Sequence, residues 1–275
     1  MGRLRYIQNS RKGIRGSIAS GNFLQQSLNG MVSEVYERDT TAKYAIGTRL
    51  VAGDGRVFRY AKAAAACKSK YGAKNLCEEA ISYTAATLAQ AVGDTTIQCT
   101  VAATDGAAGD GVIAVNELVG GYVVIYDATD AIRQQRGIIA NTAAATSSIT
   151  ITLDGPLTTA VVITTNNFEV LGNPYNGVRY TNDTYSSVMG VPVCEAAANE
   201  YLWIQTWGPI CITPGSTTPD PGADTEERQV VFDGEGSIIC YKNSTTSDRQ
   251  IAGFIIQADS AAAAGPPFIM LQISP

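Results

Sequence analysis

The residues with the greatest chemical potential in this sequence are carboxylates, because the chain contains no histidine. Histidine is the usual general acid or base near neutral pH, so Ser-His-Asp and Cys-His catalysis are excluded. Catalysis by paired carboxylates, as in glycoside hydrolysis, remains compatible with the composition. The candidate acids are Glu169, Glu195 and Glu200, and nothing in their spacing pairs them. The sequence therefore predicts a protein that is not an enzyme and has no catalytic residues.

Metal and cofactor motifs are also missing from the sequence. Six cysteines form no CxxC pair, and without histidine a Cys/His zinc site is impossible. The stretch with Asp105, Asp110 and Glu117 faintly resembles a calcium loop, but it lacks EF-hand spacing and is explained more simply as a turn between strands. Neither a GxxxxGK[ST] phosphate loop nor a GxGxxG helix opening occurs. We therefore expect no metal and no cofactor.

Two tryptophans, Trp203 and Trp207, lie four residues apart in the run EYLWIQTWGP. Because four is an even interval, an uninterrupted strand would place both indole rings on the same face. Such a pair can serve as a stacking platform for a sugar, but packing in a core or against another subunit is the commoner role of tryptophan. We therefore predict that both residues pack in the core or make assembly contacts.

Charge is distributed very unevenly along the chain. Residues 1–75 hold 14 Lys+Arg against 4 Asp+Glu, a balance of +10, whereas residues 76–275 hold 6 against 21, a balance of −15. A basic segment joined to an acidic body is typical of an arm that contacts an acidic partner, although a solvated tail would have the same composition. Phosphate binding is disfavoured because no nucleic-acid recognition motif appears. The basic residues predicted as assembly contacts are Arg3, Arg5, Arg11, Lys12 and Arg15.

The overall composition favours contact with other protein subunits. Charged residues make up only 16% of the chain, so much of its surface must consist of Thr, Ser, Asn, Gln, Ala and Gly. Residues 1–20 lack the apolar core of a signal peptide, and long uncharged stretches such as 137–153 are too polar for a membrane helix. We therefore expect synthesis in a reducing cytoplasm, mostly free and buried cysteines, and no membrane contact.

The elements that must position these residues are predicted to be mainly strands. Leu50-Val51 and Val57-Phe58 flank a Gly-Asp-Gly centre, which indicates a hairpin. Residues 149–153 alternate Ile or Leu with Thr, as in a half-buried strand, and residues 268–273 form a further apolar run. A turn is also expected at residues 233–236. Short helices are expected from the apolar spacing within 23–35 and from the Ala-rich segment 75–92.

These elements predict a mainly β fold with two small β-barrel or sandwich-like domains, an extended N-terminal arm and little helix. The expected boundaries are a basic arm at 1–45, a β-hairpin with a short helix at 46–92, a β domain at 93–175, and a C-terminal β domain at 176–275.

Several segments resemble structural proteins of tailed bacteriophages, and the closest likeness is to the capsid decoration (cement) proteins. The segments are IGTRLVAGDGRVFRYAKA, NELVGGYVVIYD with RQQRGIIANT, the phrase GVPVCEAAANEYLWIQTWGPICI at residues 190–212, and AGFIIQ with PPFIMLQISP. They cover about half of the chain in separate patches and carry no catalytic residues.

This resemblance implies a virion protein that binds the outer capsid surface and stabilises the shell, after synthesis in the host bacterial cytoplasm. Its implied partners are the major capsid protein and further copies of itself, as trimers or dimers, with no direct contact to nucleic acid. Residues 1–45 would form an arm that contacts neighbouring subunits. The alternative is a phage tail, fibre or receptor-binding component with a β carbohydrate-binding domain, for which Trp203 and Trp207 are the candidate glycan contacts.

Overall fold

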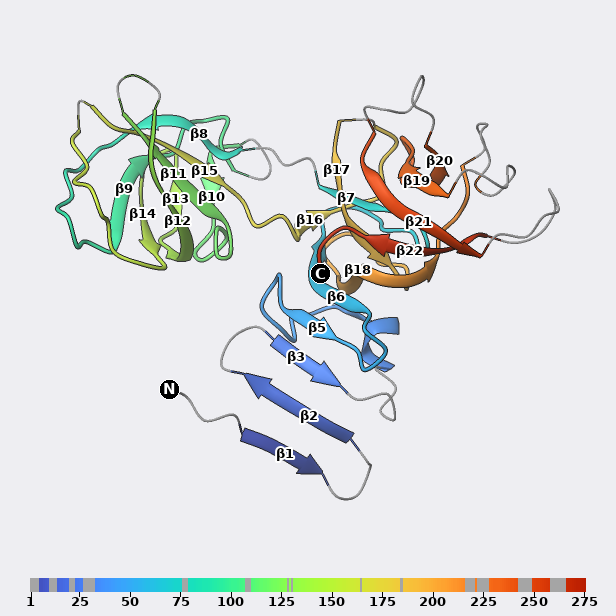
Figure 1. Cartoon of the computed structure of the whole chain (residues 1–275). Coiled ribbons are helices and arrows are strands. Elements are labelled where there is room, and N and C mark those ends of the chain that lie inside the picture. The colour runs from blue at the N-terminus through green and yellow to red at the C-terminus, as the bar shows by residue number, and fades with distance from the viewer. Residues whose placement is uncertain are drawn as a thin grey trace. The chain divides into compact units, whose positions relative to one another are not determined.

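A computed structural model confirms that the chain is mainly β (Figure 1). Within the described residues it forms 22 strands and one 3-10 turn, η1 (Ser33–Tyr36). The structure describes residues 5–9, 14–19, 23–26, 33–75, 79–106, 110–127, 129, 131–163, 165–183, 185–215, 221, 228–241, 249–257 and 266–275.

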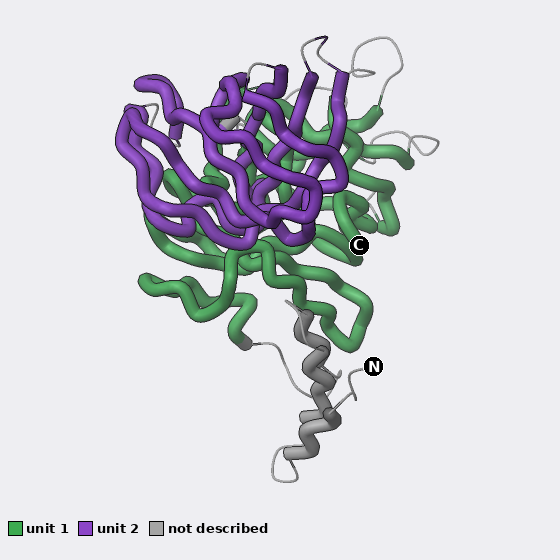
Figure 2. Tube along the Cα trace, turned by 90° about the vertical axis from the view of Figure 1, so that its left-hand side faces the viewer, with its two compact units in different colours: residues 1–76, 175–275 green, residues 77–174 purple. Residues whose placement is uncertain are grey.

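The chain divides into two compact units, which Figure 2 shows in separate colours. Unit 1 combines Met1–Leu76 with Tyr175–Pro275, and unit 2 is the inserted segment Cys77–Pro174. This division differs from the expected boundaries, because residues 77–92 join the central unit and the segments before and after it fold together. Long-range strand pairing creates unit 1, and a pass along the sequence does not reveal such pairing.

Unit 1 is built on one large sheet. Its first segment contributes β1 (Arg5–Asn9), β2 (Ile14–Ala19), β3 (Phe23–Gln26), β4 (Arg38–Asp39), β5 (Arg49–Val51), β6 (Val57–Ala63) and β7 (Ala73–Asn75). Its second segment contributes β16 (Asn176–Val178), β17 (Ser187–Pro192), β18 (Tyr201–Cys211), β19 (Gln229–Phe232), β20 (Ile238–Cys240), β21 (Ile251–Gln257) and β22 (Phe268–Gln272). The strand order is β1-β2-β3-β5-β6-β18-β22-β21-β19-β20, so β18 joins the two segments (Figure 1).

The turn signals in unit 1 are confirmed. Leu50 pairs with Phe58 and Val51 with Val57 in the β5–β6 hairpin, and Gly55 has a φ of 86° at its turn. Only glycine adopts such a φ without strain. The turn at residues 233–236 likewise joins β19 to β20, and the apolar run at 268–273 forms β22 between β18 and β21.

Both predicted helices are wrong. Within 23–35 the chain forms β3, which pairs in parallel with β5, and then the short turn η1. Within 75–92 it forms β8 (Glu79–Ala85), which pairs with β15 (Asn167–Leu171). In β8 the side chain of Ile81 is buried and that of the adjacent Ser82 is exposed, as in a strand with one buried face. Pairing and burial on one face override the helix propensity of alanine here.

Unit 2 is a small antiparallel barrel. Its six-stranded sheet has the order β8-β15-β11-β12-β14-β9, and a bridge between Ala86 and Cys99 brings its two edges together. The backbone N–H of Thr87 also donates to the carbonyl of Gln98 at 3.2 Å across this closure. The other strands of unit 2 are β9 (Thr96–Thr100), β10 (Val112–Ile113), β11 (Tyr122–Tyr126), β12 (Ile132–Asn141), β13 (Ala144–Ala145) and β14 (Ser148–Leu153).

The interior of the barrel holds the core of unit 2. Ile149, Ile151 and Leu153 of β14 are buried there, as their alternation with threonine predicts. Cys99 is buried in the same core. Among the cysteines that the structure describes, Cys67, Cys99, Cys194 and Cys211 are free, and Cys67 and Cys240 are also buried.

Candidate assembly surface

Strand β18 carries a bulge between its two tryptophans. Trp203 pairs with Tyr60 and Trp207 pairs with Val57, with a register shift between Gln205 and Trp207. Directly paired residues share a face of the sheet, and residues 57 and 60 of β6 lie on opposite faces because they are three positions apart. Trp203 and Trp207 therefore lie on opposite faces, and the prediction that both indoles share one face is wrong.

Trp203 belongs to the core of unit 1. It is 2% exposed, and its ring lies 5.1 Å from that of Tyr60 and 5.3 Å from that of Tyr44, measured between centroids. Leu50 and Phe58 of the hairpin complete the same cluster. The packing role predicted for Trp203 is confirmed, and a sugar cannot reach its ring.

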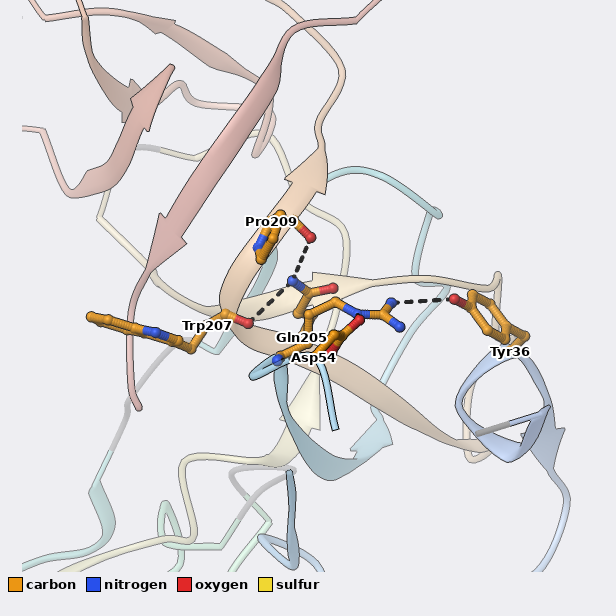
Figure 3. A network of polar contacts seen from close by, with 6 residues as sticks. Tyr36, Asp54, Gln205, Trp207 and Pro209 are labelled. Carbon is orange, nitrogen blue, oxygen red and sulfur yellow. Dashed lines mark hydrogen bonds and ion pairs between the residues drawn. The ribbon is translucent and has the colours of Figure 1, made fainter. Parts of the chain in front are cut away.

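A buried amide holds the bulge that redirects Trp207. Gln205 is 1% exposed, and its Nε2 donates to the carbonyl oxygens of Trp207 at 3.2 Å and Pro209 at 3.1 Å (Figure 3). Between those carbonyls, Gly208 has a φ of 99°, and a Cβ there would stand 3.0 Å from the Cα of Arg56. The backbone therefore makes a close turn that needs glycine at residue 208.

This turn packs against Arg56. Its Nε donates to a carboxylate oxygen of Asp54 at 2.7 Å, and its Nη1 donates to the hydroxyl of Tyr36 at 3.3 Å (Figure 3). The guanidinium carbon also lies 5.4 Å from the centre of the Phe58 ring. Arg56 thus joins the hairpin turn to η1 by polar contacts, and the bulge packs closely against the same residue.

Beyond the bulge, the outward side chains of four strands form a surface without charge. Pro209 and Met270 are paired across β18 and β22, and Phe254 of β21 pairs with Met270 on the other side. Gln229 of β19 pairs with Phe254 and extends the surface. We call this surface the uncharged sheet face; its members are Trp207, Pro209, Cys211, Gln229, Phe254, Ile256, Gln257, Phe268, Met270 and Gln272.

The uncharged sheet face is both accessible and rigidly supported. Phe254 is 44% exposed, Ile256 is 45% exposed and Phe268 is 37% exposed. The alternate residues of the same strands, among them Ile210 and Ile269, are buried in the core beneath. Single exposed apolar residues are ordinary, whereas a contiguous apolar patch on a fixed sheet marks an interaction surface. Aromatic residues and methionine, with few charges, are also typical of the centre of a protein interface.

Of the residues predicted as assembly contacts, the structure places Trp207 in this surface. Arg5 lies on β1 and Arg15 on β2, at the edge of the sheet beyond β3, where the description is of the backbone alone. Arg3, Arg11 and Lys12 lie outside the described residues. The other members of the uncharged sheet face were not predicted. The sequence pattern that could have indicated them is the uncharged outward positions in the runs WGPIC, GFIIQ and FIMLQ. The sequence alone, however, does not show that these strands are neighbours in the sheet.

The candidate carboxylates are engaged separately. In unit 2, Glu169 accepts a hydrogen bond from the hydroxyl of Tyr126 at 2.6 Å, and in unit 1, Glu200 lies 3.5 Å from Arg38. Glu195 is exposed. Asp105 accepts a hydrogen bond from the hydroxyl of Ser82 on β8. It accepts another from the backbone N–H of Ala102 within its own turn. Among the residues that the structure describes, no group of three His, Cys, Asp or Glu side chains is arranged to hold a metal ion.

No family model, no curated protein and no solved structure matches this chain. Over the described part of the chain, no helix has the length and apolar character needed to span a membrane.

Proposed function

We propose that this chain is a virion structural protein of the capsid decoration type, which binds the outer capsid surface, associates with copies of itself and stabilises the shell. The observation that carries this proposal is the uncharged sheet face. A fixed surface of ten outward side chains with no charge and several exposed apolar groups suits permanent contact with protein. The resemblance of residues 190–212 to cement proteins supports the same role, and these residues include the whole of β18.

The absence of charge favours a second copy of the chain as the occupant of this face. When a symmetric pair forms, the same patch meets itself, so any cluster of like charges would repel across the contact. The uncharged sheet face carries no such charges, and Phe254 and Phe268 supply large apolar areas for mutual burial. Oligomers attached at several points bind a repeating shell far more tightly than single subunits.

The charge asymmetry of the sequence supports a separate contact with the shell. Residues 1–75 carry a balance of +10 and would attract an acidic neighbour at long range. Ordering an extended segment costs about 1–2 kcal/mol per residue of backbone entropy, so such a contact becomes favourable when many equivalent contacts form together. We therefore assign the basic segment to the shell and the uncharged sheet face to the neighbouring copy.

Purified particles of the virus that encodes the chain test this role directly. Quantitative mass spectrometry should find the protein in mature heads at a fixed ratio to the major capsid protein. Dissociated tails, purified separately, serve as the control and should lack it. Absence from particles would overturn the proposal, and presence in the tail fraction alone would favour the alternative of a tail or receptor-binding component.

A further inference from the structure

A group of tyrosines lies on the outer surface of the unit 2 barrel. Tyr122 and Tyr126 occupy the two ends of β11, and Tyr83 belongs to β8, with β15 between the two strands. Tyr83 is 48% exposed and Tyr122 is 45% exposed. The rings of Tyr83 and Tyr126 lie 5.6 Å apart at a tilt of 48°. This outer surface therefore presents aromatic rings rather than the short polar side chains that dominate the composition of unit 2.

Hydrogen bonds to β15 hold two of these rings in place. The hydroxyl of Tyr126 donates to Glu169 at 2.6 Å, and the amide of Asn167 donates to the hydroxyl of Tyr83 at 2.8 Å. Asn167 pairs directly with Tyr126, so all four side chains belong to one cluster across three strands. Rings that are already fixed lose little freedom when a ligand binds, which favours affinity.

The polar groups around the rings are planar amides and a carboxylate. On the same outer surface, Val124 of β11 pairs with Glu169 on one side and with the exposed Gln135 on the other. A pyranose has an apolar C–H face and a rim of hydroxyl groups. The C–H face packs on an aromatic ring, while amide and carboxylate oxygens and N–H groups bind the hydroxyls. The cluster offers both kinds of contact side by side.

We propose that this outer surface of the unit 2 barrel binds a neutral oligosaccharide. Tyr126 lies four positions after Tyr122 along an extended strand, a distance of about 13 Å, which suits several linked sugars rather than one. Unit 2 holds 2 basic residues against 10 acidic ones, so anionic glycans and phosphates would be repelled. The ligand class is therefore an uncharged glycan.

Sheet stabilisation alone does not account for the whole arrangement. A cross-strand ring pair such as Tyr83 and Tyr126 strengthens a sheet without any ligand. Tyr122, however, lies outside this ring pair, and its direct neighbours Gly137 and Leu171 carry no aromatic ring. This ring is nevertheless kept at the surface, in line with the cluster. The inference is independent of the proposed capsid role, because none of these residues belongs to unit 1.

A glycan array tests the proposal with the full chain. The probes are neutral oligosaccharides of hexoses and N-acetylhexosamines, with sialylated and uronic-acid glycans as the acidic comparison. Calorimetry on the best neutral binder should show that Tyr126→Ala and Tyr122→Ala each weaken binding about tenfold or more. Tyr126→Phe, which keeps the ring, should retain most of the affinity. The matched control is Tyr185→Ala, since Tyr185 of unit 1 is 96% exposed.

Three results would overturn the proposal: no binding to any neutral glycan, stronger binding to the acidic glycans, or unchanged affinity in folded Tyr122→Ala and Tyr126→Ala proteins. Thermal melting identifies any variant that fails to fold, and the exposed Tyr122, outside the Tyr83–Tyr126 ring pair, is the variant expected to fold normally. Incorporation of Tyr122→Ala into particles should match the wild type. Loss of glycan binding and loss of the capsid role are therefore separate outcomes.

Discussion

Trp203 and Trp207 lie on opposite faces of β18 because the strand gains one residue between their pairing positions on β6. This single bulge gives the two indoles different environments: one is buried in the core, and the other belongs to the uncharged sheet face. Such bulges redirect side chains at functional surfaces of sheets. In this protein the bulge moves an aromatic ring from the interior to the candidate contact surface.

Substitution of each tryptophan should separate these environments. Trp203→Ala removes a ring that is 2% exposed and packed on Tyr44 and Tyr60, so we expect a loss of about 3–5 kcal/mol in the free energy of unfolding. Trp207→Ala should cost much less, because its ring is half-buried, but should weaken self-association. Urea unfolding measures the first effect and sedimentation the second. Equal losses of stability would contradict the assignment of the two faces.

The amide of Gln205 should be essential to the bulge. Gln205→Leu keeps the approximate size of the side chain but removes the donor to the carbonyls of Trp207 and Pro209. Buried acceptors without a partner cost about 1–3 kcal/mol, so the free energy of unfolding should fall by that amount. The measurement is chemical denaturation of the full chain.

The matched control for Gln205→Leu is Gln135→Leu, since Gln135 is exposed on β12 and lies outside the uncharged sheet face. This change should alter stability by no more than about 0.5 kcal/mol. If the two variants were equally stable, the amide of Gln205 would not hold the bulge.

Two buried thiols should make the protein less stable in alkali. Burial raises the pKa of Cys67 and of Cys99 from 9.0 to about 12. Below pH 9 each thiol is protonated in both states and adds no pH dependence. Between pH 9 and 12 the unfolded chain releases protons that the folded chain retains, so stability falls as pH rises.

Unfolding at several pH values across that window tests this effect. The Cys67→Ala, Cys99→Ala double variant should lose stability less steeply than the wild type, by at most about 1.4 kcal/mol per pH unit for each thiol removed. Tyrosines with raised pKa values, such as Tyr44, contribute equally to both proteins. Identical slopes would contradict the burial argument for the thiols.

Local signals in the sequence predicted much of the fold. The Gly-Asp-Gly turn correctly indicated the β5–β6 hairpin, and the Ile149–Leu153 alternation correctly indicated a half-buried strand. Both depend on neighbouring residues, which is why they are visible in the sequence. The Ala-rich segment 75–92 misled the prediction because its strand pairs with β15, far along the chain.

The candidate surface could be predicted only in part for the same reason. Trp207 stood out by residue type, but its neighbours Met270 and Phe254 come from strands about sixty and forty-five residues away along the chain. The bulge at Gln205 was also invisible, because it depends on the register with β6. Register is a property of paired strands and cannot be read from one strand alone.

The central claim is that the uncharged sheet face joins copies of this chain, and the mass of the protein in solution tests it most directly. Sedimentation equilibrium should show the wild type self-associating, while Phe254→Asp, which buries a charge in the contact, should be a folded monomer. Ile139→Asp is the control, since Ile139 is 56% exposed on the unit 2 barrel and lies outside the face. The claim would be contradicted if the wild type were monomeric. It would also be contradicted if the Phe254→Asp protein associated as tightly as the Ile139→Asp protein.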